Sequence, residues 1–165
     1  MPNIRRGAIL HDIGKMAIPD EILHKNGPLV GNEWHVMKMH PVYAYEMLMD
    51  IKFLTPALDI PRYHHERWDG KGCPYGLKGE QIPIAARIFA IIDAWDALTS
   101  DRPYRPRYSG DEALRILQGN SGILYDPKVV KAFFEFIQNS TYDYNWELTT
   151  PSGVKGTKQG ARTRR

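Results

Sequence analysis

Residues 82–99 show the clearest helical periodicity in the chain, and this segment limits the folds that the chain can adopt. Its large apolar side chains recur at intervals of three or four residues and therefore fall on one helix face: Ile84, Ile88, Ile91, Ile92, Trp95 and Leu98. No segment alternates apolar and polar side chains over the length of a strand. We therefore expect an all-α fold, and 165 residues suffice for a single domain with its own core.

Further helices are expected on both sides of this segment, with Pro, Gly and capping residues at their ends. The expected boundaries are 4–10, stopped by Gly14; a short turn begun by Pro19; 33–40, capped by Asn32; 42–51, opened by Pro41; 56–66, kinked at Pro61; 111–118; and 127–138. The paired histidines would lie on the helix of residues 56–66. Residues 69–80, rich in Gly and Pro, are predicted to form a loop.

The charge distribution separates a basic tail from the rest of the chain. Five Lys and Arg residues follow Pro151 without any Asp or Glu, so residues 1–150 carry 17 basic and 19 acidic side chains, a formal charge of −2. This balance does not indicate a nucleic-acid-binding domain. The tail, residues 141–165, is expected to be disordered because it has little apolar surface to bury. The single cysteine, Cys73, and the absence of a long apolar run predict a cytoplasmic protein.

Histidines and a carboxylate gather in two short segments. The first segment holds His11 and Asp12, and the second holds the adjacent pair His64 and His65. Imidazole and carboxylate groups are typical ligands of iron, manganese and zinc. A carboxylate shared between histidines suits a pair of metal ions of the kind that hydrolyses phosphate esters. The set as a whole therefore predicts a metal-dependent hydrolase.

Two further residues allow a metal-binding and a structural interpretation. Asp93 lies within the most apolar predicted helix, where a carboxylate needs a cation or strong hydrogen bonds. It could be a metal ligand, or it could pair with an arginine such as Arg87. His40 precedes Pro41, and by itself it indicates a histidine at the end of a helix.

Together these segments resemble the HD-GYP family, a branch of the HD phosphohydrolase superfamily, over residues 7–138. The segments that agree are 8–15 (AILHDIGK), 18–20 (IPD), 33–34 (EW), 37–38 (MK) with His40 and Pro41, 64–72 (HHERWDGKG), 86–88 (ARI), 93–99 (DAWDALT) and 101–105 (DRPYR). The resemblance implies a helical bundle of the HD phosphohydrolase type over residues 1–140. It also implies an enzyme that hydrolyses cyclic di-GMP to linear pGpG, with further cleavage to GMP left open.

The resemblance also assigns roles to residues by position. It implies six metal ligands, with Asp12 as the bridging one: His11, Asp12, His40, His64, His65 and Asp93. The cofactors would be two or more divalent metal ions, iron or manganese in this family. Lys15 would approach the scissile phosphate, and Arg102 and Arg105 would hold the phosphates of the nucleotide. A metal-bound water with its pKa lowered to about 7 would attack the phosphorus.

The chain departs from the family pattern at two places. Cys73 stands where the family motif has tyrosine, and the thiol lacks the ring and hydroxyl of a phenol. Tyr75, two residues later, is a candidate replacement. In the family a further histidine ligand comes from earlier helices, whereas the ten residues before His11 contain no His, Asp or Glu. We therefore expect a domain that lacks its N-terminal helices and one ligand.

Three hypotheses for the function follow. The first is a cyclic di-GMP phosphodiesterase. The second is a catalytically impaired HD-GYP domain that acts as a nucleotide-binding or protein-interaction module in regulation. The third, an HD phosphohydrolase for another nucleotide, is weakened by the match through residues 101–105. As partners we expect cyclic di-GMP, signalling proteins, or a fused sensor or receiver domain in a longer parent protein, and neither nucleic acid nor membrane.

Overall fold

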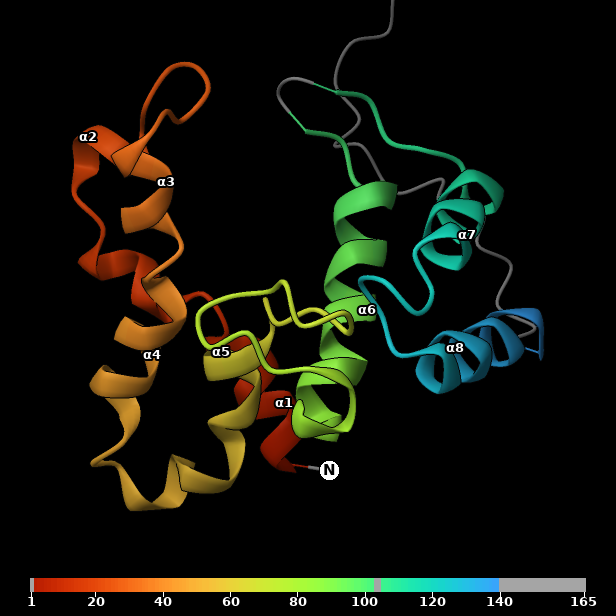
Figure 1. The fold of residues 1–165 in the computed structure, drawn as a ribbon, viewed down its shortest axis with the longest axis horizontal. Coiled ribbons are helices and arrows are strands. Elements are labelled where there is room, and N and C mark those ends of the chain that lie inside the picture. Colours follow the sequence, from red (N-terminus) through yellow and green to blue (C-terminus); the bar gives the residue numbers. More distant parts are fainter. Residues whose placement is uncertain (1, 103–104, 140–165) are drawn as a thin grey trace, which may run out of the picture.

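The computed structural model describes residues 2–102 and 105–139, and this part of the chain is helical (Figure 1). Its elements, in order, are α1 (Pro2–Leu10), η1 (Ile13–Ala17), α2 (Asp20–Leu23), α3 (Asn32–Met37), α4 (His40–Leu48), η2 (Lys52–Ala57), α5 (Asp59–Tyr63), η3 (Gly79–Gln81), α6 (Ile84–Thr99), α7 (Gly110–Gly119) and α8 (Pro127–Asn139), where η marks a 3-10 helix. Within the described residues only two isolated β-bridges form, and no strand. The predicted all-α fold is confirmed.

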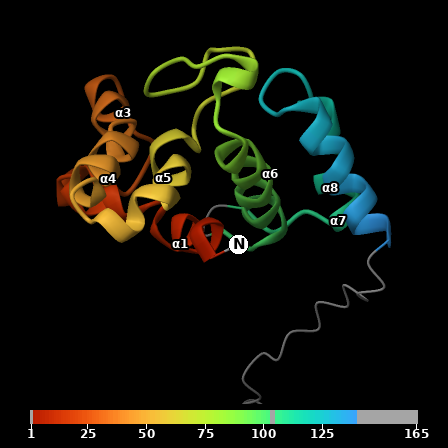
Figure 2. The same ribbon diagram turned by 90° about the horizontal axis from the view of Figure 1, so that it is seen from below.

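Helix α6 stands between two groups of helices (Figures 1 and 2). Helices α1 to α5 lie on one side of it, and α7 and α8 lie on the other. A cluster around Leu48, Leu54 and Leu58 forms a core on the first side. On the second side, Ile91 of α6 packs with Leu117 and Val130. Ile91, Trp95 and Leu98 of the apolar face predicted for residues 82–99 thus supply the core that joins α6 to α7 and α8, whereas Ile84 and Ile92 of that face are exposed.

A close approach between η1 and α4 fixes the position of the HD segment. A Cβ added at Gly14 would overlap the carbonyl oxygen of His40 and lie 2.5 Å from the amide nitrogen of Ala44. Gly14 lies inside η1, so the prediction that it stops α1 was wrong. The missing side chain instead allows the backbone that follows Asp12 to touch the first turn of α4.

Two other predicted boundaries need correction. Asn32 is the first residue of α3, and its N-cap is Gly31 with φ 47°. His40 begins α4, with Pro41 in the first turn, and does not end the preceding helix. Proline fits there because the first N–H groups of a helix have no acceptor within it.

The paired histidines follow a helix and do not lie on one. Pro56 lies in η2, and α5 contains only Asp59–Tyr63, with Pro61 in its first turn. His64 is the C-cap of α5. The chain therefore turns at the paired histidines, which allows adjacent side chains to face the same site.

Helix α7, expected over residues 111–118, begins with a capping box at Ser109. The Ser109 hydroxyl accepts a hydrogen bond from the backbone N–H of Glu112, and the Glu112 carboxylate accepts one from the N–H of Ser109. None of the described helices combines the length and hydropathy needed to cross a bilayer. The predicted disordered tail, residues 141–165, lies outside the described residues.

Candidate metal centre

Three histidines of the predicted site are oriented in the same way, by hydrogen bonds from the ring to the backbone. Nδ1 of His11 lies 2.7 Å from the carbonyl oxygen of Ala8, Nδ1 of His40 lies 2.8 Å from that of Met37, and Nδ1 of His64 lies 3.0 Å from that of Ile60. A carbonyl only accepts, so each Nδ1 carries the proton. In the neutral ring Nε2 then keeps its lone pair, as in histidines that bind metal ions.

The Nε2 atoms of these histidines converge on Asp12. Oδ1 of Asp12 lies 3.4 Å from Nε2 of His40 and 4.0 Å from Nε2 of His64, while Oδ2 lies 3.2 Å from Nε2 of His11. The two carboxylate oxygens thus face different histidines. This is the arrangement that a carboxylate bridging two metal ions requires.

Nε2 of His40 and Nε2 of His64 lie only 3.4 Å apart. Because Nδ1 of each ring donates to a carbonyl, the facing atoms are two lone pairs in the neutral state, and two acceptors repel each other. Both rings are buried, so water does not separate them freely. A cation placed between these atoms and Asp12 removes the repulsion, so the donor set fits a divalent metal ion.

The structure also brings His65 and Asp93 to this site. Metal-binding atoms of His40, His64 and His65 lie within 4.8 Å of one another. Oδ1 of Asp93, from α6, lies 4.0 Å from Nε2 of His11. The suggested pair of Asp93 with Arg87 is wrong, since Arg87 pairs with the buried Asp126 at 2.7 Å. The other five predicted ligands therefore gather around Asp12, and the roles of all six as ligands stay a prediction.

The electrostatics of the site keep His40, His64 and Asp12 in the protonation states that metal binding requires. Burial lowers the pKa of His40 and lowers that of His64 to about 3, which keeps both rings neutral at pH 7. Burial acts to raise the pKa of Asp12, but its interactions with His11 and Lys15 outweigh burial and hold the pKa well below its usual range. Nζ of Lys15 lies 2.6 Å from Oδ2 of Asp12.

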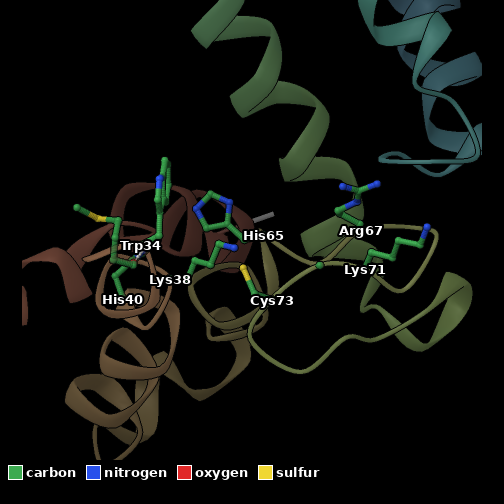
Figure 3. A pocket seen from close by; sticks show the side chains of 9 residues that line it. Trp34, Lys38, His40, His65, Arg67, Lys71 and Cys73 are labelled. Atoms are coloured by element: carbon green, nitrogen blue, oxygen red, sulfur yellow. Dashed lines mark hydrogen bonds between the residues drawn. The ribbon is translucent and has the colours of Figure 1, made fainter. Parts of the chain in front are cut away.

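A cavity of about 310 Å³ adjoins this cluster (Figure 3). Its wall includes His40 and His65 of the cluster, together with Trp34, Met37, Lys38, Arg67, Lys71, Gly72 and Cys73. Cys73, predicted to contact the substrate, thus lies beside the histidines. Tyr75 is not among the residues of the cavity wall, and its hydroxyl accepts a hydrogen bond of 3.2 Å from Nε of Arg62. Its role as a replacement for the missing tyrosine stays a prediction.

Comparison with known families agrees with this geometry. A family model described as an HD domain matches residues 3–129. The chain belongs to the HD-domain family. The resemblance to HD-GYP proteins is thereby confirmed at the level of the family, and the helical bundle expected from it is the one observed.

Characterised relatives of this HD domain act on cyclic dinucleotides. It is 47% identical over 131 residues to the cyclic di-GMP phosphodiesterase response regulator RpfG of Xanthomonas campestris, covering 78% of the chain and 35% of the relative. It is also 42% identical over 155 residues to a cyclic di-GMP phosphodiesterase of Thermotoga maritima. That alignment covers 93% of this chain and 42% of the relative. A 3'3'-cGAMP-specific phosphodiesterase of Vibrio cholerae is 41% identical over 134 residues, covering 80% and 26%. The chain thus spans less than half of each relative.

Solved structures show the same fold. A cyclic GMP-AMP specific phosphodiesterase of Vibrio cholerae superposes with a TM-score of 0.64 at 19% identity, covering 84% of this chain and 38% of the other. The HDG"Y"P protein Bd1817 of Bdellovibrio bacteriovorus superposes with a TM-score of 0.62 at 20% identity, covering 82% and 43%.

The two arginines predicted to hold phosphates are not among the residues of the cavity wall. The Arg105 guanidinium donates to the carbonyl oxygens of Ala97 and Pro106, each at 2.8 Å, and lies over the ring of Tyr108. Backbone hydrogen bonds join Arg102 and Arg105, and residues 103–104 between them lie outside the described residues. No contact among the described residues links either arginine to the histidine cluster, so their role stays a prediction.

Six residues of the cavity wall were not predicted as site residues from the sequence: Trp34, Met37, Lys38, Arg67, Lys71 and Gly72. Trp34 and Lys38 are separated by four residues, which places them on one side of a helix, and this spacing was the available signal. Arg67 and Lys71 lie on a loop, where periodicity gives no such signal. The guanidinium of Arg67 is paired with Asp69 at 2.7 Å.

Proposed function

We propose that this HD domain is a metal-dependent phosphodiesterase that hydrolyses cyclic di-GMP to linear pGpG, with GMP as a further product. The observation that carries the proposal is the pair of facing Nε2 atoms, 3.4 Å apart, of His40 and His64 beside the carboxylate of Asp12. Bound divalent metal ions would lower the pKa of a water molecule and neutralise charge on the phosphate. Relatives named for cyclic di-GMP phosphodiesterase activity support the choice of substrate.

In this proposal the described residues have three tasks. His11, Asp12, His40, His64, His65 and Asp93 hold two or more metal ions, for which iron or manganese fits a site of nitrogen and oxygen ligands. Lys15 keeps Asp12 ionised and presents a positive charge to the phosphate. Arg102 and Arg105 contact the nucleotide, which requires Arg105 to leave its contacts with α6.

The test is to incubate the chain, purified without oxygen and loaded with iron or manganese, with cyclic di-GMP and to separate the products by chromatography. We expect pGpG, and its formation should be lost in Asp12→Ala. Asp20→Ala is the matched control, because the side chain of Asp20 is 93% exposed on α2 and outside the site. A folded, metal-loaded chain that produces neither pGpG nor GMP would contradict the proposal.

Cys73 in the cavity wall favours a second candidate, a catalytically impaired domain that binds a nucleotide or a partner protein. A thiol offers no ring on which a base can stack. For this candidate we expect binding of cyclic di-GMP with a measurable affinity but without product. Detection of pGpG that depends on Asp12 would exclude it.

For the parent protein we propose a cytoplasmic signalling role, in which a sensor or receiver domain or a partner protein controls the site. The similarity to a relative named as a response regulator supports this role. The single, unpaired Cys73 is in keeping with a reducing compartment.

A further inference from the structure

The wall of the cavity beside the candidate metal centre combines an aromatic side chain with basic side chains. Trp34 is 51% exposed and lies in the same cavity wall as the buried His40 and the exposed His65. A large aromatic side chain kept at a cavity wall and partly open to solvent is suited to stacking against a planar ligand. His40 and His65 line both the cavity and the cluster, so a ligand in the cavity would lie next to the metal centre.

A positive charge lies beside the indole. Lys38 follows Trp34 by four residues and lines the same cavity as Trp34 and Cys73. In Figure 3 the side chains of Trp34, Lys38, His65 and Cys73 gather in one part of the cavity. Among the described residues, no acidic side chain forms an ion pair with Lys38. Arg67, by contrast, is paired with Asp69.

The size of the cavity limits the ligand. Its volume of about 310 Å³ is at the lower end of the range for small-molecule sites. One purine nucleotide fits this volume better than a complete cyclic dinucleotide. With the phosphate at the metal centre, the base of the same nucleotide would enter the cavity.

We propose that this cavity is a guanine subsite, in which the base stacks on Trp34 and Lys38 donates to O6 and N7. Lysine has only donors to offer, and guanine presents two acceptors on that edge. Adenine presents N7 together with an amino group that also donates, so it loses one contact and meets a repulsive one. The inference rests on the proposed function, because it assigns one half of the cyclic dinucleotide to a defined part of the site.

The experiment is to measure the binding of GMP and of AMP to the metal-loaded chain by calorimetry. Both ligands carry the same phosphate, so contacts of the phosphate with the metal centre cancel in the ratio of affinities. We expect GMP to bind about fivefold to tenfold more tightly than AMP, and Lys38→Met to bring the ratio close to one. Trp34→Ala should weaken both ligands by about fivefold or more, and Trp34→Phe should recover part of the loss.

Matched controls are His35→Ala, the exposed neighbour of Trp34 on α3, and Lys131→Met, on α8 and outside the cavity. Equal affinities for GMP and AMP in the unmodified chain would overturn the guanine assignment. Unchanged binding in Trp34→Ala would overturn the subsite itself.

Hydrolysis of cyclic di-GMP by the unmodified chain separates this inference from the proposed function. Nucleotide binding that depends on Trp34 and Lys38, without hydrolysis, would support the subsite and contradict the enzyme. Hydrolysis with a KM that neither substitution changes would support the enzyme and overturn the subsite.

Discussion

The carboxylate of Glu66 accepts a hydrogen bond of 2.7 Å from the backbone N–H of Tyr75, and it also accepts one of 3.0 Å from that of Leu77. Glu66 is 4% exposed and directly follows the paired histidines. One buried side chain therefore ties the loop that carries Cys73 to the segment that carries His64 and His65.

Glu66→Ala is expected to lower the free energy of unfolding by about 1–3 kcal/mol, because two backbone donors lose their acceptor. It should also raise the KM for cyclic di-GMP by loosening the cavity wall. Urea denaturation and steady-state kinetics measure the two effects. Glu46→Ala, at an exposed position on α4, is the control, and an equal change in both variants would contradict this role for Glu66.

His64→Ala and Asp12→Ala are each expected to weaken metal binding by more than tenfold. Both substitutions remove a group at the centre of the donor set, and even the loss of an outer hydrogen-bond partner weakens such sites by about 10-fold to 100-fold. Metal content after dialysis, measured by mass spectrometry, gives the result. His24→Ala, at an exposed residue of the first half of the chain, should retain its metal. Unchanged metal content in the first two variants would contradict their assignment as ligands.

Stability of the metal-free protein should fall as the pH falls below about 6.5. Burial lowers the pKa of His64 to about 3, whereas the unfolded chain has the ordinary value of 6.5. Between these values the unfolded chain binds more protons, so acid favours unfolding, and the stabilisation is complete only above pH 6.5. His40 acts in the same direction. His11 has the opposite effect on the pH dependence, because the interaction with Asp12 raises the pKa of His11.

The measurement is urea denaturation in EDTA at pH 7.5 and pH 5.5, with an expected loss of about 1 kcal/mol at the lower pH. The loss should shrink in His64→Gln. Equal stability of the unmodified protein at both pH values would show that the buried rings do not resist protonation.

Gly14→Ala is expected to lower the free energy of unfolding by about 3 kcal/mol, because the new methyl group would overlap the His40 carbonyl of α4. It should also reduce metal binding, since Asp12 and His40 lie on the two segments that would be pushed apart. Thermal unfolding with and without manganese tests both effects. Gly119→Ala, where an added Cβ meets nothing within 4 Å, should be nearly neutral. Equal melting temperatures for the two variants would contradict the packing argument.

The sequence predicted those features that depend on local pattern. Periodicity located α6 to within two residues, and the resemblance to HD-GYP proteins named Asp12 and the five residues that gather around it. It missed features that depend on tertiary contact. Gly14 was predicted to stop a helix, whereas in the structure it allows close contact with α4. That contact joins segments distant in the sequence, so local pattern does not indicate it. Arg87 was named as a possible partner of Asp93, whereas its partner in the structure, Asp126, is 39 residues away in the sequence.

The histidines and carboxylates of the candidate centre come from η1 and its flanking residues, α4, the turn after α5, and α6. They span the chain from His11 to Asp93, so no short fragment contains the complete set. A nascent chain acquires the centre only when α6 has docked against the helices before it. Metal uptake would then indicate that α6 has packed against the first half of the domain. Loss of metal would remove a link between α6 and that half.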